Sequence, residues 1–397
     1  MPAREATDPR PLTLLVAPDS FKGSLSSVEV AQALADGWSR ARPGDRVRLS
    51  PLSDGGEGTL EAVLAAGGWS LLPAHAQDPL GRPVSARFLR DGRRGLVELA
   101  EASGLSRLDP AERDAMAAST FGTGQVLAAA IGLGIRELVL GLGGSATTDG
   151  GSGLLRALGA RFLDADGSEL PPGGAALAQL ARVDLSGLSP TLAEVHLTVA
   201  SDVTNPLLGE RGAAATYGPQ KGANEAQVAQ LDAALARYAD RLEAATGKDV
   251  REVAGAGAAG GTTAGLLAIA DRFAALEIRP GIEVVMELTG FGERLADADI
   301  VVTGEGRVDA QTAYGKTALG VARRAAAAGR ACLAFGGGVT PEGIAALAEF
   351  GVLVVPVAEA PMSVEEAMAA GAPPLRRAAE RAARLVSLGA GMLSARP

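Results

Sequence analysis

The stretch DIVVTGEGRVDAQTAYGKTALGV, residues 299–321, decides the fold class of this chain. It begins with the β-branched run Ile300 to Val302, which is typical of a buried strand in a parallel sheet. We expect the strand to end there, because a glycine-rich loop with three charged side chains follows: Glu305, Arg307 and Asp309. An alanine-rich segment, residues 318–328, then predicts a helix that ends at Gly329. Strand, charged loop and helix start are typical of α/β enzymes that handle phosphate, because loop amides and helix N-termini offer unpaired N–H donors.

Lys316 stands shortly before the predicted helix. Together with Ala310, Gly315 and Thr317 it has the spacing of a phosphate-binding loop, although alanine replaces the first glycine of that pattern. The gap between strand and helix is also longer than such a loop normally has. Lys316 is therefore either a phosphate ligand or a solvated lysine at a helix start, and the sequence leaves both interpretations open.

Composition narrows the function classes. With 397 residues, of which 47% are hydrophobic, the chain is long enough for two or three domains with a sizeable core. Its net charge of −9 and its 3% of aromatic residues argue against a nucleic-acid surface. Cys332 is the single cysteine, so no intrachain disulfide can form and a reducing, cytoplasmic compartment is expected. No stretch has the pattern of a signal peptide or of a membrane span, so we expect no membrane partner.

The N-terminal region predicts the order strand, helix, strand, helix. Residues 12–17 and 47–51 are the strands, and the helix between them begins with a capping box formed by Ser26 and Glu29. If the strands are parallel, right-handed crossovers bring the loops after them to the same carboxyl edge of the sheet. Those loops carry candidate ligand-binding residues: Asp19, Ser20, Lys22, Asp54, Gly55, Gly56 and Glu57.

A different pattern occupies the middle of the chain. Apolar and polar residues alternate through residues 71–76, 84–89 and 96–100, which predicts antiparallel strands. Strands of the buried type return at residues 138–142 and 195–200, and a polar loop follows each of them. Those loops and the later sequence YGPQKG carry further candidates: Gly143, Gly144, Ser145, Thr147, Asp149, Asp202, Asn205 and Lys221.

Strands of the parallel type resume toward the C-terminus, at residues 331–335 and 352–357. We therefore predict an α/β fold with one discontinuous domain formed by both chain ends, residues 1–70 and 291–397. A second α/β domain, residues 71–290, is predicted to be inserted into it and to contain a mixed sheet.

Five acids stand on loops at predicted strand ends: Asp54, Glu57, Asp202, Glu305 and Asp309. A single carboxylate at such a place is often a helix cap or a solvated turn. Five of them suit phosphoryl transfer, because carboxylates hold Mg²⁺ and accept the proton of the attacking hydroxyl. The reaction also needs positive charge on the transferred group. Four cations stand near these acids in sequence: Lys22, Lys221, Arg307 and Lys316. The pattern favours a site for a nucleotide and a metal ion.

The glycine-rich loop at residues 143–151 supports other interpretations. Gly141, Gly143 and Ala146 fit a dinucleotide fingerprint. Asp164 lies downstream, where it could hold a ribose, so a nicotinamide-dependent oxidoreductase acting on a small hydroxy acid is one alternative. The same loop could be a nest for a phosphate or a hydroxy acid, or a tight turn without a ligand. A catalytically silent nucleotide-binding regulator is a further alternative, although the chain contains no helix-turn-helix or basic arm.

Seven motifs, taken in order and spacing, resemble one known family. They are APDSFKGS (17–24), PLSDGGEGT (51–59), GLGGSATTDGG (141–151), SDVTNPLLG (201–209), GPQKGA (218–223), GAGAAGG (255–261) and TGEGRVDAQT followed by GK (303–316). The chain is similar over about residues 12–385 to bacterial glycerate kinases of the type that makes 2-phosphoglycerate.

The resemblance implies a Rossmann-like parallel-sheet domain and an inserted α/β domain, with the active site in the cleft between them. It implies phosphorylation of D-glycerate to 2-phospho-D-glycerate by ATP, with Mg²⁺ as cofactor and in-line transfer of the phosphoryl group. The 3-phosphate remains an alternative product, because spacing in a sequence does not define which hydroxyl is attacked. The oligomeric state is left open between monomer and homodimer.

The resemblance also implies roles for residues in these motifs. The expected catalytic residues are Lys22, Asp202, Arg307 and Asp309, with one of the two aspartates as the base and the two cations on the transferred group. The expected metal ligands are Asp54, Glu57 and Glu305. The expected substrate and nucleotide contacts are Asp19, Ser20, Asp54, Gly55, Gly56, Glu57, Gly143, Gly144, Ser145, Thr147, Asp149, Asn205, Lys221, Glu305 and Lys316.

Overall fold

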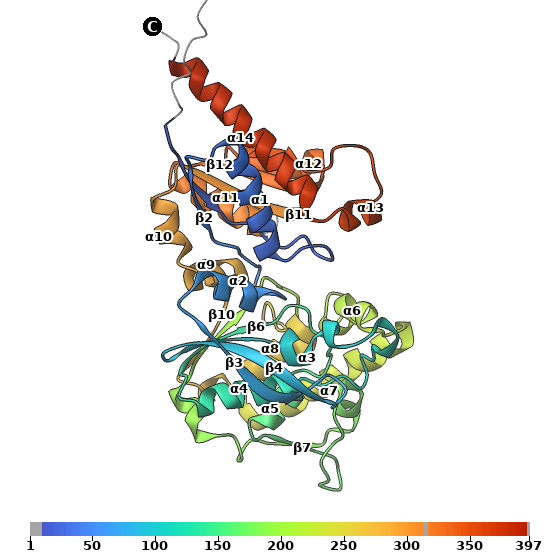
Figure 1. Ribbon diagram of the computed structural model, residues 1–397. Helices are drawn as coiled ribbons and strands as arrows, with labels where there is room; N and C mark the ends of the chain where they lie inside the picture. Colours follow the sequence, from blue (N-terminus) through green and yellow to red (C-terminus); the bar gives the residue numbers. More distant parts are fainter. Residues whose placement is uncertain (1–9, 311, 313–316, 395–397) are drawn as a thin grey trace, which may run out of the picture. The chain divides into compact units, whose positions relative to one another are not determined.

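A computed structural model describes residues 10–310, 312 and 317–394 (Figure 1). The described chain divides into two compact units. The first, here called the terminal unit, takes the described residues of 1–54, 61–67 and 282–397. The second, here called the central unit, takes residues 55–60 and 68–281. Among the described helices, none combines the length and the apolarity that a membrane crossing requires.

The terminal unit is built on a parallel sheet that has five strands among the described residues. These strands are β1 (Thr13–Val16), β2 (Arg46–Leu49), β11 (Ile300–Val308), β12 (Ala331–Val339) and β13 (Leu353–Pro356). They lie in the order β13-β12-β11-β1-β2, and every neighbouring pair is parallel. The carboxyl ends of the strands therefore meet at one edge of the sheet. The predicted Rossmann-like parallel sheet, which joins strands from both ends of the chain, is confirmed.

Helices cover this sheet, and they include those predicted after Ser26 and over residues 318–328. They are α1 (Ser27–Ala41), α10 (Phe291–Ala296), α11 (Thr317–Ala327), α12 (Pro341–Ala348), α13 (Val364–Ala369) and α14 (Ala372–Ser394). The capping box of Ser26 and Glu29 is present at the start of α1. Helices α1 and α14 lie side by side (Figure 1). Gly37 allows this close approach, because a Cβ atom there would lie 2.1 Å from the carbonyl oxygen of Arg376.

The structure corrects the expected end of the strand at Val302. Strand β11 continues to Val308 and stays paired with β12 along its whole length. Glycines on both strands make this possible, because a Cβ atom at Gly337 would lie 2.6 Å from the carbonyl oxygen of Gly306. The glycines interpreted as loop residues thus serve backbone contact between two strands. Consequently Glu305 and Arg307 belong to the strand, and Asp309 is the first residue after it.

The central unit contains a mixed sheet, as predicted. Its strands are β3 (Ser70–Gln77), β4 (Pro83–Asp91), β5 (Arg94–Glu98), β6 (Glu137–Gly141), β9 (His196–Ala200) and β10 (Ala275–Arg279), in the order β10-β9-β6-β5-β4-β3. The pairs β3 with β4 and β4 with β5 are antiparallel, and the other neighbours are parallel. A small antiparallel pair, β7 (Arg161–Leu163) with β8 (Arg182–Asp184), was not expected from the sequence.

The helices of the central unit bury one apolar core. They are α3 (Ala100–Ser103), α4 (Phe121–Gly132), α5 (Ser152–Ala157), α6 (Ala213–Tyr217), α7 (Glu225–Thr246) and α8 (Ala258–Ala268), and α2 (Thr59–Ala66) and α9 (Gly281–Leu288) each begin in this unit and continue in the terminal one. The long helix α7 ends at Gly247 in the left-handed conformation, as its sequence predicted. Phe162 and Tyr238 pack against each other in the core, with ring centroids 5.8 Å apart.

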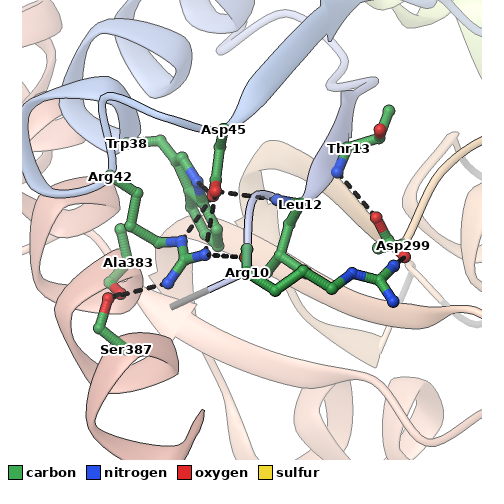
Figure 2. A network of polar contacts seen from close by, with 9 residues as sticks. All are labelled: Arg10, Leu12, Thr13, Trp38, Arg42, Asp45, Asp299, Ala383 and Ser387. Carbon is green, nitrogen blue, oxygen red and sulfur yellow. Dashed lines mark hydrogen bonds and ion pairs between the residues drawn. The ribbon is translucent and has the colours of Figure 1, made fainter. Parts of the chain in front are cut away.

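A buried ion pair stabilises the start of the terminal unit (Figure 2). The side chains of Arg42 and Asp45 are 3% and 2% exposed, and Arg42 Nε donates to Asp45 Oδ2 at 2.6 Å. Trp38 Nε1 and the amide of Leu12 also donate to the Asp45 carboxylate, at 2.8 and 3.0 Å. Burial alone would raise the pKa of Asp45, but hydrogen bonds from Arg42, Leu12 and Trp38 outweigh it and lower the pKa overall.

The Arg42 guanidinium also connects segments from the two ends of the chain. Its Nη1 donates to Ser387 Oγ of α14 at 3.0 Å, and its Nη2 donates to the carbonyl oxygen of Arg10 at 3.1 Å (Figure 2). One side chain thereby joins the described start of the chain, the end of α1 and the last helix.

Candidate active site

Two loops of the terminal unit bring together residues that the sequence singled out. Lys22 follows β1 and Asp54 follows β2, and Lys22 Nζ lies 3.2 Å from Asp54 Oδ2. The Asp54 charge raises the pKa of the Lys22 ammonium, so this amine stays protonated at neutral pH. The parallel arrangement of β1 and β2 explains the meeting of the two loops, because both leave the sheet at its carboxyl edge.

Asp19 is the buried carboxylate of this cluster, with 7% of its surface exposed. Its Oδ1 accepts hydrogen bonds from the amide of Ser20 at 2.6 Å and from Ser20 Oγ at 3.2 Å. Its Oδ2 accepts one from Thr317 Oγ1, at the start of α11, at 2.5 Å. Burial raises the pKa of Asp19 and the nearby charge of Asp54 raises it further. The positive charge of Lys22 acts in the opposite direction and lowers the pKa of Asp19 in part.

The end of β11 supplies the other charged residues of the terminal unit. Arg307 Nε lies 2.9 Å from Asp309 Oδ2, and the Arg307 side chain is 70% exposed. Glu305 is buried and accepts a 2.6 Å hydrogen bond from Thr312 Oγ1. The Thr312 hydroxyl also accepts one from the Asp309 amide at 3.1 Å, so it holds the turn after the strand. Lys316 lies outside the described residues.

In the central unit, two glycine-rich loops pack backbone against backbone. A Cβ atom at Gly143 would lie 2.3 Å from Gly56 Cα, and one at Gly141 would lie 2.7 Å from the carbonyl oxygen of Gly55. Glycine is therefore required for the contact between the DGGEG loop and the loop after β6. Glu57 is exposed beside this contact, with Oε2 3.7 Å from the Cβ position of Gly144.

Glu98 is a buried acid that sequence analysis did not single out. It ends β5, and its Oε1 accepts hydrogen bonds from the amides of Thr59 and Leu60 at 2.5 and 3.2 Å, which caps the start of α2. Burial raises its pKa to about 8, against the lowering effect of those two amides. The sequence shows a glutamate in an alternating strand, and such a residue would normally face solvent.

The buried carboxylate of Asp149 stabilises the loop after β6 through hydrogen bonds. It is fully buried, and its Oδ2 accepts hydrogen bonds from the amide of Thr120 and from Thr120 Oγ1, both at 2.9 Å. The amides of Gly151 and Gly153 also donate to this carboxylate, at 3.1 and 3.2 Å. Burial raises the pKa of Asp149. These contacts assign Asp149 a structural role, and its direct contact with a ligand stays a prediction.

Lys221, which lies more than 70 residues later in the sequence, contacts the same loop. Its side chain is buried, and its Nζ donates to Ser145 Oγ at 2.9 Å and to the carbonyl oxygen of Thr147 at 2.6 Å. Burial lowers the pKa of Lys221 to about 7, although the charge of Asp149 acts in the opposite direction. Lys221 therefore contacts the predicted binding loop directly, at the hydroxyl of Ser145 and at the backbone of Thr147.

Asp202 and Asn205 occupy the loop after β9. The exposed Asp202 accepts a hydrogen bond from the amide of Gly281 at 3.0 Å. Asn205 Oδ1 accepts one from the Tyr217 hydroxyl at 3.0 Å, and Asn205 Nδ2 donates to the carbonyl oxygen of Arg211 at 2.8 Å. The Asn205 side chain thus has partners on both sides and fixes the path of this loop.

The described residues contain no group of three or more His, Cys, Asp or Glu side chains arranged to hold a metal ion. The carboxylate of Asp54, whose charge raises the pKa of Asp19, is nevertheless of the chemical type that Mg²⁺ binds. This ion typically keeps several waters and binds through one or two protein carboxylates together with substrate phosphates, and a complete protein cage is not needed.

With this geometry described, comparison with known proteins decides the family. Residues 14–387 match the family described as the Glycerate kinase family. The chain belongs to this family. It is 42% identical to a glycerate kinase of Halalkalibacterium halodurans over 374 residues, which cover 94% of this chain and 97% of that protein. It is 43% identical to the glycerate 2-kinase of Escherichia coli over 313 residues, which cover 78% and 81% of the two chains.

A solved structure gives the same assignment. A crystal structure described as a glycerate kinase 2 from Salmonella typhimurium superimposes with a TM-score of 0.81 at 39% identity, covering 96% of this chain and 99% of that one. Membership of the glycerate kinase family confirms the prediction of a kinase. It also sets aside the nicotinamide enzyme and the silent regulator. In agreement, Asp164 caps a local turn by accepting the amides of Asp166 and Ser168, both at 2.9 Å.

Proposed function

We propose that this protein transfers the γ-phosphoryl group of ATP to the 2-hydroxyl of D-glycerate, giving 2-phospho-D-glycerate and ADP. The observation that carries the proposal is the cluster of Asp19, Lys22 and Asp54 at the carboxyl edge of a parallel sheet, in a chain of the glycerate kinase family. The name of the Escherichia coli relative, a glycerate 2-kinase, supports the 2-hydroxyl as the acceptor.

Phosphoryl transfer depends on positive charge around the transferred group. We assign Lys22 and Arg307 to this role. Each is paired with a carboxylate, Lys22 with Asp54 and Arg307 with Asp309. Both cationic side chains are largely exposed, at 75% and 70%, so these ion pairs stabilise the fold little and can be exchanged for phosphate oxygens.

The proton of the attacking hydroxyl requires an acceptor within hydrogen-bond reach. We assign this role to Asp202 or Asp309, each of which lies just after a strand of its unit. Asp309 is held by Arg307, and Asp202 is held by the amide of Gly281. Both are therefore oriented before the substrate arrives.

We propose Asp54, Glu57 and Glu305 as the residues that hold Mg²⁺. The ion would neutralise charge that develops on the phosphoryl oxygens. The remaining predicted contacts to substrate and nucleotide are Asp19, Ser20, Gly55, Gly56, Gly143, Gly144, Ser145, Thr147, Asp149, Asn205, Lys221 and Lys316. They come from both units, and we propose that they serve one reaction.

Phosphorus NMR of the purified protein with ATP, Mg²⁺ and D-glycerate tests this proposal. The expected result is a new phosphomonoester signal that coincides with added 2-phosphoglycerate and does not form in the presence of EDTA. A signal that coincides with the 3-phosphate would keep the kinase and overturn the proposed regiochemistry. Intact ATP in a sample of folded protein would reject D-glycerate as the substrate.

A further inference from the structure

The ammonium of Lys221 is buried without a carboxylate partner. Its side chain lies at the end of a short 3-10 helix, Pro219–Lys221, and the residue is 1% exposed. Among the described residues it forms no ion pair, and its hydrogen-bond acceptors are two neutral oxygens, Ser145 Oγ and the carbonyl of Thr147. A buried charge whose hydrogen-bond acceptors are neutral is costly, and the nearby charge of Asp149 offsets this cost only in part, because the pKa of Lys221 is still lowered. The arrangement is therefore suited to a state in which an anion lies nearby.

The direction of the hydrogen bonds shows where that anion would bind. A protonated lysine can only donate, so Ser145 Oγ accepts at 2.9 Å. The Ser145 hydroxyl then keeps its own proton for another acceptor. No described residue accepts that proton in a hydrogen bond assigned to the structure, and the hydroxyl is thus prepared to donate to a ligand.

The position of Ser145 fits this role. It is 7% exposed and directly follows Gly144, which is exposed at the surface of the loop after β6. A ligand at this loop would reach the serine hydroxyl more readily than the Lys221 ammonium, because Lys221 is only 1% exposed. The positive charge would act on the ligand through the hydroxyl that it polarises.

We propose that Lys221 and Ser145 form a relay that binds the carboxylate of the hydroxy-acid substrate. The ammonium donates to Ser145 Oγ, and the serine hydroxyl donates to a carboxylate oxygen. Ser145 is the contact residue and Lys221 the positioning residue. This inference rests on the proposed function and adds to it the group that recognises the acid end of glycerate.

Charge favours a carboxylate over the triphosphate at this place. The relay offers one hydroxyl donor backed by one cation, which matches a singly charged group.

Three full-length variants test the relay: Ser145→Ala, Lys221→Met and the control Thr148→Val. Thr148 lies on the same loop, is fully buried, and its hydroxyl has no hydrogen-bond partner among the described residues. The control therefore removes a hydroxyl without touching Lys221. Steady-state kinetics would be measured with D-glycerate, with its uncharged carboxamide, and with ATP as the varied substrate.

We expect Ser145→Ala and Lys221→Met each to lower kcat/KM for D-glycerate about 10- to 100-fold, the usual worth of a hydrogen bond to a charged group. The wild-type preference for D-glycerate over the carboxamide should shrink by the same factor, and KM for ATP should change less than about threefold. The double variant should lose no more activity than the more damaging of the two single variants, because both substitutions act on one contact. Thr148→Val should retain the wild-type preference.

Two outcomes would overturn the relay. A rise in KM for ATP with an unchanged carboxylate preference would assign Ser145 to the nucleotide. If Ser145→Ala and Thr148→Val showed the same preference for D-glycerate over the carboxamide, Ser145 would have no role in recognising the carboxylate. If Lys221→Met does not fold, Ser145→Ala alone decides between these results. A wild-type protein that does not phosphorylate D-glycerate refutes the proposed function, whereas an active wild type with unaffected variants refutes only the relay.

Discussion

Replacing Asp45 with asparagine should destabilise the terminal unit strongly. The substitution keeps the size of the side chain and one acceptor oxygen, but it removes the charge opposite Arg42, whose side chain is 3% exposed. The new amide group would also face at least one of three donors, namely Arg42, Trp38 Nε1 and the amide of Leu12. Breaking a buried ion pair on one side typically costs about 3–5 kcal/mol, and we expect a loss of that size in the free energy of unfolding.

Tryptophan fluorescence makes the measurement specific to this unit. The chain has two tryptophans, and Trp38 donates directly to Asp45. In a Trp69→Phe background, urea unfolding followed by fluorescence therefore reports on the surroundings of Trp38. A matched control is Asp297→Asn, because Asp297 pairs with Arg48 but its side chain is 64% exposed, and it should cost less than about 1 kcal/mol.

The pH dependence gives an independent check on the same carboxylate. Although burial raises the pKa of Asp45, its hydrogen bonds lower it overall in the folded protein. Its stabilising contribution is therefore complete above the unfolded pKa, about 3.9, and is lost as pH falls through the lower folded value. Asp45→Asn should flatten this acid limb. An Asp45→Asn variant that matches the exposed control at pH 7 would refute the buried ion pair as a source of stability.

Three further predictions concern the site. Asp202→Asn or Asp309→Asn should lower kcat/KM about 10²- to 10⁴-fold, and losses below tenfold in both would show that neither is the base. Glu98 has a pKa raised to about 8, so its folded form binds a proton that the unfolded chain releases near pH 4, and stability should fall between about pH 4 and 8. Glu98→Gln should remove that slope in thermal unfolding measured across this range, and an unchanged slope would contradict the assignment. Burial lowers the pKa of Lys221 to about 7, although the nearby charge of Asp149 raises it. We therefore expect kcat/KM for D-glycerate to fall above about pH 7, and Lys221→Arg should abolish that inflection.

Much of the fold could be predicted because its signals are local. The capping box at Ser26 and the glycine stop at Gly247 each act within one turn of a helix, and both are present. The end of β11 was predicted wrongly because its cause is not local. Residues 303–308 have the sequence pattern of a loop. They form a strand because the glycines of residues 336–338 lie opposite them in β12, and this pairing is visible only in the structure.

The site divides in the same way. The meeting of Lys22 with Asp54 could be predicted, because parallel strands bring their following loops to one edge. The burial of Lys221 and Glu98 could not, because it depends on packing between segments far apart in sequence. A lysine in a polar motif and a glutamate in an alternating strand both predict exposure. Their changed pKa values are therefore properties of the tertiary structure, which no local pattern contains.

The position of β1 between β2 and β11 also has a consequence during translation. Its neighbour β2 emerges from the ribosome soon after it, but its other neighbour, β11, is made nearly three hundred residues later. At roughly 5–20 residues per second, β1 waits on the order of 15–60 s with one edge unpaired. The segment 68–281 is completed within that interval and can fold first. A nascent chain stalled before residue 300 would thus contain a folded central unit and two strands with an unpaired edge. That edge could bind a chaperone or pair with another chain and aggregate.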